Sequence, residues 1–152
     1  QLADYSEEQT SRIEEILEAK NLNEKMDALT TSEDFFCPTV LQANALLEGN
    51  SAVYMYRFAQ ERPNSESLRA YHGAELPYVF DTHDEWLPTT SEDRAISNEM
   101  KDAWVNFART GNPVEAGVWP EWSEKAEAMI FKYPSIVGEL NLELCRALDY
   151  DI

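Results

Sequence analysis

The sequence contains two histidines, and one of them has a setting that favours proton transfer. His72 is followed by the small residues Gly73 and Ala74, then by the carboxylate of Glu75 and an apolar run that ends at Phe80. Imidazole is the side chain best suited to exchange a proton near neutral pH. A single histidine is also common as a structural residue, so these residues alone leave both roles open.

The elements before His72 place it on a loop supported by a sheet. Residues 52–59 are rich in Val, Tyr, Met and Phe without polar alternation, which predicts a strand buried on both faces. Residues 68–71 then lead into the His72 turn. A proton-transfer residue on a loop held by rigid elements is a common arrangement. The other histidine, His83, lies in a polar stretch, and we expect it to be exposed and without a chemical role.

The remaining pattern is mostly helical. Ser6 begins a capping box with Gln9, Pro38 is suited to the first turn of a longer helix, and Thr90 begins a second box with Asp93. Residues 129–133 predict a second short strand, and a last short helix is expected to carry Cys145. The chain therefore predicts an α/β arrangement with two or three strands and about five helices.

Composition excludes several classes of function. The 152 residues contain 29 acidic and 12 basic side chains, for a formal charge of −17, and such a surface repels nucleic-acid phosphates. No apolar run approaches the roughly 20 residues that span a bilayer. The sequence opens on Gln1 in a polar stretch without the pattern of a signal peptide, and we expect it to be a processed or excised piece.

Two cysteines, Cys37 and Cys145, lie far apart in the sequence. They form no Cys-x-x-Cys pair and have no histidine cluster beside them, so we expect no metal site and no cofactor. The residues alone allow either two buried thiols or a bridge, because free cysteine is among the most buried residue types.

The stretch around His72 resembles the histidine segment of the type-B carboxylesterase and cholinesterase family, serine esterases of the α/β-hydrolase fold. The family pattern, His-x-x-Glu/Asp-Leu-x-Tyr-Val-Phe, is filled by His72, Glu75, Leu76, Tyr78, Val79 and Phe80. Three further segments occur in the family's order, namely residues 34–38, 53–58 and 104–113 with Trp119-Pro120. Asp81 departs from the pattern, because the family more often carries glycine there.

The resemblance implies a role for His72 and a place for this chain in a larger enzyme. A serine esterase needs a serine nucleophile, a histidine that takes its proton and an acid that orients the histidine, and α/β-hydrolases order them serine, acid, histidine. This sequence has no Gly-x-Ser-x-Gly and no HGGG-type segment. We therefore expect residues 1–152 to be the C-terminal segment of a carboxylesterase domain, an α/β-hydrolase segment that supplies His72 as general base. On this interpretation the rest of the esterase is its partner, a small ester is the substrate, and the segment alone is inactive.

The resemblance also implies a disulfide between Cys37 and Cys145, since cholinesterase-like members join these two places. A disulfide indicates an oxidising compartment, so we expect a secreted or periplasmic protein; without the bridge, a cytoplasmic one. Two other classes remain open: a non-catalytic esterase-like adhesion protein of the neuroligin kind, and an unrelated acidic interaction domain. Non-catalytic members of the neuroligin kind often lose the serine or the histidine, so the presence of His72 favours an enzyme. The ordered segments argue against a chance match.

Overall fold

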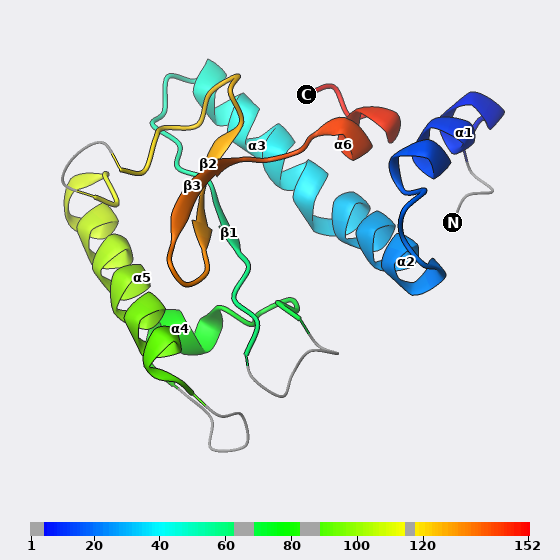
Figure 1. The fold of residues 1–152 in the computed structure, drawn as a ribbon. Helices are drawn as coiled ribbons and strands as arrows, with labels where there is room; N and C mark the ends of the chain where they lie inside the picture. The colour runs from blue at the N-terminus through cyan, green and yellow to red at the C-terminus, as the bar shows by residue number, and fades with distance from the viewer. Residues whose placement is uncertain (1–4, 63–68, 83–88, 115–117) are drawn as a thin grey trace. The chain divides into compact units, whose positions relative to one another are not determined.

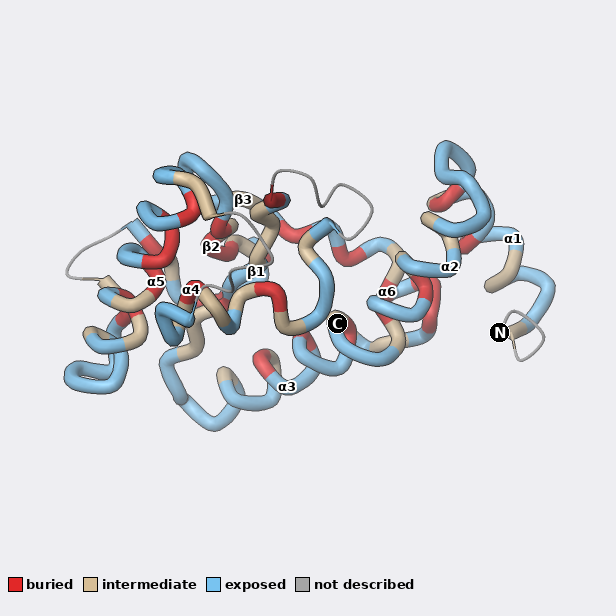
Figure 2. Tube along the Cα trace, turned by 90° about the horizontal axis from the view of Figure 1, so that it is seen from below, coloured by how far each residue is buried: buried red, intermediate tan, exposed pale blue. Residues whose placement is uncertain are grey.

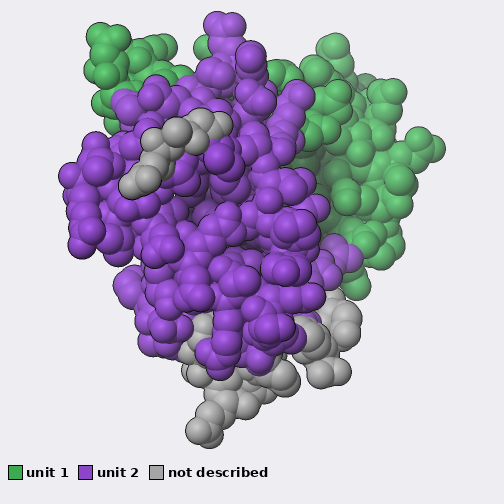
Figure 3. All heavy atoms as spheres, turned by 60° about the vertical axis from the view of Figure 1, so that its left-hand side comes forward, with its two compact units in different colours: residues 1–51, 140–152 green, residues 52–139 purple. Residues whose placement is uncertain are grey.

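The computed structural model describes residues 5–62, 69–82, 89–114 and 118–152. His83 lies outside the described residues. The chain forms two compact units, one made of residues 1–51 and 140–152 and the other of residues 52–139 (Figure 3). Within the described residues no helix combines the length and the apolar character needed to cross a membrane.

The first unit is helical (Figure 1). It consists of α1 (Glu7–Ile16), α2 (Leu22–Thr31), η2 (Ser32–Phe36), α3 (Cys37–Glu48) and α6 (Glu143–Ala147). The predicted capping box of Ser6 and Gln9 is present at the start of α1. Asn21 caps α2 in the same way with Glu24, which explains the break between the first two helices.

A separate helix was expected to begin at Pro38, but the chain stays helical from α2 through α3. The residues at both junctions have right-handed helical dihedrals, and η2 is a turn of π-helix. Pro38 in the first turn of α3 explains the wider turn, since a proline ring clashes with the carbonyl four residues earlier in an α-helix. A proline therefore marks a change of helix geometry here and not a new start.

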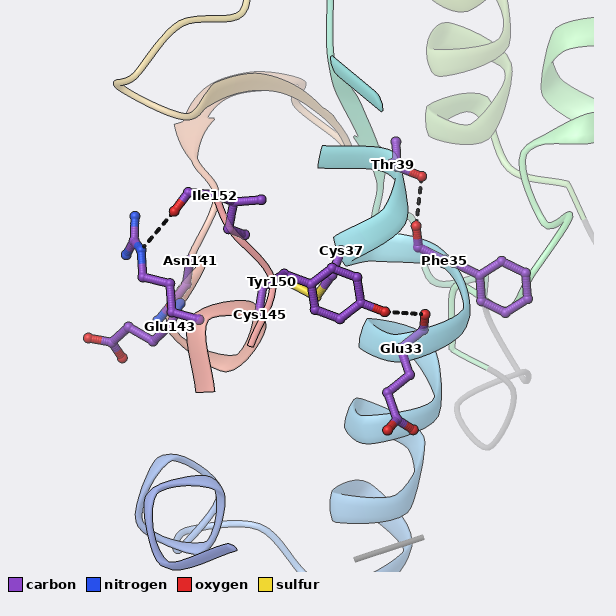
Figure 4. Close-up of a disulfide and its surroundings, with 10 residues drawn as sticks. Glu33, Phe35, Cys37, Thr39, Asn141, Glu143, Cys145, Tyr150 and Ile152 are labelled. Carbon is purple, nitrogen blue, oxygen red and sulfur yellow. Dashed lines mark hydrogen bonds between the residues drawn. A yellow bond between two sulfur atoms is a disulfide. The ribbon is translucent and has the colours of Figure 1, made fainter. Parts of the chain in front are cut away.

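A disulfide joins the two sequence-distant parts of this unit, as predicted. Cys37 at the start of α3 and Cys145 in α6 are bridged, with Cα atoms 5.5 Å apart (Figure 4). Both are fully buried in a cluster with Ile13, Leu17, Leu29, Ala147 and Leu148. Beside the bridge, the Tyr150 hydroxyl donates to the Glu33 backbone carbonyl at 3.1 Å. The final residues of the chain are thereby held on the α2–α3 helical run.

The second unit is built on a three-stranded mixed sheet in the order β1 (Tyr56–Phe58), β2 (Glu127–Phe131), β3 (Ile136–Glu139). Strand β1 runs parallel to β2, with Arg57 opposite Ile130, so the two strands expected from residues 52–59 and 129–133 are neighbours. Strand β3 runs antiparallel to β2. The sequence interpretation ended the second strand at Pro134 and missed β3, although Ile136 and Val137 are typical strand residues.

The first strand differs from its prediction in length and burial. Residues 52–59 were expected to form a strand buried on both faces, whereas the strand covers Tyr56–Phe58 only, and Tyr56 and Arg57 are exposed. The physical reason is its place at one edge of the described sheet, where β2 is its one partner. A run of apolar residues predicts burial correctly only when neighbours cover both faces.

Two helices pack on this sheet, α4 (Leu76–Phe80) and α5 (Ser91–Thr110). The predicted box of Thr90 and Asp93 begins α5, and Gly111 ends it with a φ of 75°. The buried residues of α5 follow one side of the helix (Figure 2). They join α4 and β2 in one core, which contains Tyr78, Ile96, Met100, Ala103, Trp119, Met129 and Phe131.

Candidate active-site segment

His72 lies in a tight turn that runs directly into α4. The Ala74 amide donates to the Tyr71 carbonyl at 2.9 Å, and the Leu76 amide donates to the Gly73 carbonyl at 3.1 Å. Gly73 has a φ of 84°, a region that side-chain-bearing residues rarely adopt, so the small residue after His72 has a structural reason. The turn leaves His72 exposed at the surface of its unit.

His72 lies in the part of the chain that connects the parallel strand β1 to the next helix. The chain leaves the carboxyl end of β1 at Phe58 and reaches the His72 turn before α4 begins. In open α/β sheets, ligands bind outside the carboxyl ends of the parallel strands. Glu75 connects the turn to α4, because its carbonyl accepts from the amides of Tyr78 and Val79 at 2.9 and 3.1 Å. Its charge also acts on Tyr56: the partial burial of that hydroxyl raises its pKa, and Glu75 adds to the rise.

A buried polar network holds α4 against the first turn of α5. Tyr78 is fully buried, and its hydroxyl donates to Oδ1 of Asp93 at 2.7 Å. Gln60, just after β1, donates to the same oxygen at 3.0 Å. Oδ2 of Asp93 accepts from the backbone amide and the hydroxyl of Thr90 at 2.8 and 2.9 Å. Nε of Arg62 donates to the Tyr78 hydroxyl at 3.1 Å, and its guanidinium lies 4.9 Å from the Tyr78 ring centroid.

The network fixes the protonation of its two central groups. Burial raises the pKa of the Tyr78 hydroxyl far above its ordinary value, and the nearby Asp93 raises it further. The hydrogen bond from Arg62 lowers this pKa, but by less than the other two raise it. Burial alone would also raise the pKa of Asp93, but the hydrogen bonds from Thr90, Tyr78 and Gln60 bring it below its ordinary value. Tyr78 therefore donates as a neutral phenol to an ionised Asp93 at neutral pH.

Sequence reasoning identified Asp93 as a helix-capping residue and missed its bonds to Tyr78 and Gln60. The signal was weak, because a capping residue is usually exposed and these partners lie 15 and 33 positions away. Cys37 and Cys145 belong to the other unit and have a structural role there.

Two hollows among the described residues are lined by side chains other than His72. One of about 150 Å³ lies over β2 and is lined by Glu99, Asp102, Ala103, Asn106, Pro113, Val114, Trp119, Met129 and Phe131. A shallower hollow lies along α4 and α5, between Val79, Phe80, Lys101, Trp104, Val105 and Ala108. Neither of these two hollows includes His72, so a substrate pocket at the imidazole must be formed by other residues.

Comparison with known proteins identifies the family. Residues 3–138 match the carboxylesterase family. The chain belongs to the carboxylesterase family. This carboxylesterase segment is 32% identical over 108 residues to an acetylcholinesterase of Bungarus fasciatus, covering 66% of the segment and 18% of that protein. It is 35% identical over 97 residues to the para-nitrobenzyl esterase of Bacillus subtilis, covering 60% of the segment and 20% of that protein.

Solved esterases show the same fold. The crystal structure of the Geobacillus stearothermophilus carboxylesterase matches with a TM-score of 0.74 at 30% identity, over 95% of this carboxylesterase segment and 31% of that chain. A para-nitrobenzyl esterase structure matches with a TM-score of 0.70 at 27% identity, over 92% of the segment and 30% of that chain. The predicted α/β-hydrolase class is confirmed, and the segment spans about a fifth of the length of the curated relatives.

The departure from the family pattern at Asp81 has a clear position in the structure. Asp81 ends α4 with φ 55° and ψ 35°, the left-handed region in which glycine is unstrained. Aspartate tolerates this region better than most residues. Its carboxylate also lies 2.9 Å from Nζ of Lys101 on α5. The turn that glycine would make is therefore preserved, and Asp81 adds an ion pair between the two helices.

Proposed function

We propose that this chain is the histidine-bearing part of a serine carboxylesterase, with His72 as the general base. The observation that carries the proposal is the exposed position of His72, on a tight turn after the carboxyl end of β1, within a chain of the carboxylesterase family. The sequence has no Gly-x-Ser-x-Gly, and in this proposal the nucleophilic serine and the orienting acid come from the rest of the esterase. The substrate class is a carboxylic ester.

In this reaction His72 moves one proton in each half. The imidazole accepts the serine proton as the serine oxygen attacks the ester carbonyl, and then delivers it to the departing alcohol. Water repeats the sequence on the acyl-enzyme, with the proton passing through the imidazole again. The turn and α4 hold the backbone of His72 in place, so less entropy is lost when the imidazole is brought to the serine oxygen.

The partner that we propose for this chain is the remainder of the same esterase. Large apolar side chains of the second unit are exposed, among them Leu76 at 50%, Phe80 at 68% and Val105 at 47%. Among the described residues β1 pairs with β2 on one side, so its other edge offers backbone groups to a further strand. An esterase that is about five times as long as the matched segment has the surface to cover both features.

An oxidising compartment follows from the bridge. The disulfide Cys37–Cys145 supports a secreted or periplasmic location, because glutathione and thioredoxin keep cytosolic thiols reduced. A relative named secreted lipase 5 from Gibberella zeae, 32% identical over 95 residues, supports the same location.

The test is a substitution of each histidine in the complete esterase. His72→Ala should reduce kcat for a simple ester such as para-nitrophenyl acetate by about 10⁴-fold or more, since no other group then takes the serine proton. His83→Ala is the matched control and should retain activity. Residues 1–152 alone should hydrolyse no ester. Unchanged turnover in His72→Ala would show that His72 is not the base, and an inactive wild-type protein would favour a non-catalytic, adhesion-type member.

A further inference from the structure

We propose that Tyr78 is a positioning residue for His72, because its hydroxyl fixes α4, and the His72 turn attached to it, to Asp93 at the start of α5. The inference rests on the proposed role of His72 as the general base. It concerns a residue six positions from the imidazole that is fully buried and acts through backbone and helix contacts.

The first step is the connection between His72 and Tyr78. Successive backbone hydrogen bonds join them: Ala74 to Tyr71 at 2.9 Å, Leu76 to Gly73 at 3.1 Å and Tyr78 to Glu75 at 2.9 Å. Each bond closes a turn of four residues, and each turn overlaps the one before it by two residues. The His72 turn and α4 therefore move together, and whatever locates α4 also locates the backbone that carries the imidazole.

The second step is the weakness of α4 as an independent helix. It has five residues, about one and a half turns, and helices of that length have little stability of their own. Its position must come from side-chain contacts with its neighbours. The Tyr78 ring packs on Phe58 at the end of β1, with centroids 4.8 Å apart, and the Tyr78 carbonyl accepts from the Ser97 hydroxyl at 2.7 Å.

The third step is the role of the hydroxyl within these contacts. Ring packing on Phe58 has little directionality, and the Ser97 bond holds α4 at one backbone carbonyl, about which the helix can still rotate. The bond from Tyr78 to the ionised Asp93 is directional and buried, and hydrogen bonds to charged groups are the strong ones. Asp93 also binds Gln60 and Thr90, so the hydroxyl connects α4 to β1 and to α5 at a single point.

The variant that tests this role is Tyr78→Phe in the complete esterase. It removes one oxygen and keeps the ring that packs on Phe58 and under Arg62. We expect kcat per titrated active serine to fall at least 10-fold with KM changed less than 2-fold, since small misplacements of a catalytic group have effects of this size. Tyr133→Phe, which removes the hydroxyl of an exposed tyrosine in the same unit, is the matched control.

A second measurement reads the position of His72 without using activity. The protein is labelled with ¹³C-histidine, and the His72 ring resonance is assigned by its loss in His72→Ala. In Tyr78→Phe this resonance should shift or broaden, and in Tyr133→Phe it should not. If Tyr78→Phe fails to fold, Asp93→Asn serves instead, because it keeps the side-chain volume and removes the charge that Tyr78 binds.

The outcomes separate this inference from the proposed function. Loss of kcat together with a moved His72 resonance supports the positioning role. An unchanged resonance, or an unchanged kcat per active serine with only a lower melting temperature, overturns it and leaves Tyr78 as a core residue. Retained activity in His72→Ala contradicts the proposed function, and the positioning role in catalysis falls with it; the resonance in Tyr78→Phe then still shows whether the hydroxyl holds the turn.

Discussion

At the scale of single residues, the best-defined chemistry among the described residues is the buried carboxylate of Asp93. A carboxylate without solvent is costly unless hydrogen bonds replace the lost water. Tyr78, Gln60 and Thr90 provide four such bonds to its two oxygens. These bonds lower the pKa of Asp93 although burial raises it, so the folded protein favours the ionised form more than the unfolded chain does.

This preference predicts an acid-sensitive contribution to stability. A carboxyl group whose pKa is lower in the folded state stabilises the fold above its unfolded pKa, near 3.9, and the contribution is lost as the pH falls through the folded value. Asp93→Asn should therefore lower the free energy of unfolding by about 1.5 to 3 kcal/mol at pH 7. The difference from wild type should shrink between pH 5 and pH 2, as measured by denaturant unfolding.

The control for Asp93 is its neighbour Glu92, which is an acidic residue of the same first helical turn but is exposed. Glu92→Gln should change stability by less than about 0.5 kcal/mol, the usual range for a surface substitution. An Asp93→Asn variant whose stability follows that of Glu92→Gln across this pH range would contradict the assignment of an ionised, hydrogen-bonded Asp93.

At the scale of elements, local signals predicted the helices better than the strands. Capping residues determine a helix start through bonds within four residues, and the boxes at Ser6 and Thr90 were both predicted correctly. Strands depend on neighbours distant in sequence. For this reason β1 was predicted too long and too buried. The strand β3, which begins two residues after Pro134, was not predicted.

In the candidate site, too, local features were predicted from the sequence and contacts between distant residues were not. His72 was identified from its surroundings in sequence and from the family pattern, both of which are local. The contacts around α4 involve Gln60 and Arg62 from the segment after β1 and Asp93 from the start of α5, which are about 30 positions apart. No periodicity or spacing in the sequence connects these residues, so their association had to come from the structure.

The cap of α2 gives a prediction at this scale. Asn21 accepts from the Glu24 amide at 3.1 Å, and Glu24 accepts from the Asn21 amide at 3.0 Å. Asn21→Ala should reduce the free energy of unfolding by about 1 kcal/mol, because an orphan amide of the first turn loses its acceptor. Asn23→Ala, an exposed asparagine inside the same helix, should be neutral or slightly stabilising, since alanine has the higher helix propensity. Equal effects measured by circular dichroism during denaturation would contradict the capping role.

At the scale of the whole molecule, the two units are stabilised differently: one by a continuous apolar core, the other by an apolar core together with a disulfide. The unit of residues 52–139 has a continuous core that joins α4, α5 and β2. The other unit combines residues 1–51 with 140–152, so its two parts are separated by 88 residues of chain. Ordering the second part requires closing that long loop, which has an entropic cost. The disulfide offsets this cost, because it keeps the two parts joined in the unfolded chain as well.

The bridge therefore predicts a large effect of reduction. Cys37 and Cys145 are 108 positions apart, and in the chain-entropy model a loop of this length corresponds to about 4 to 5 kcal/mol. Reduction should lower the free energy of unfolding by up to this amount, with hydrogen exchange rising first in α6. A double Cys37→Ala, Cys145→Ala variant should show the same low stability and no response to reductant. Thiol titration of the denatured, unreduced chain should find no free thiol; two thiols would contradict both the bridge and the oxidising compartment inferred from it.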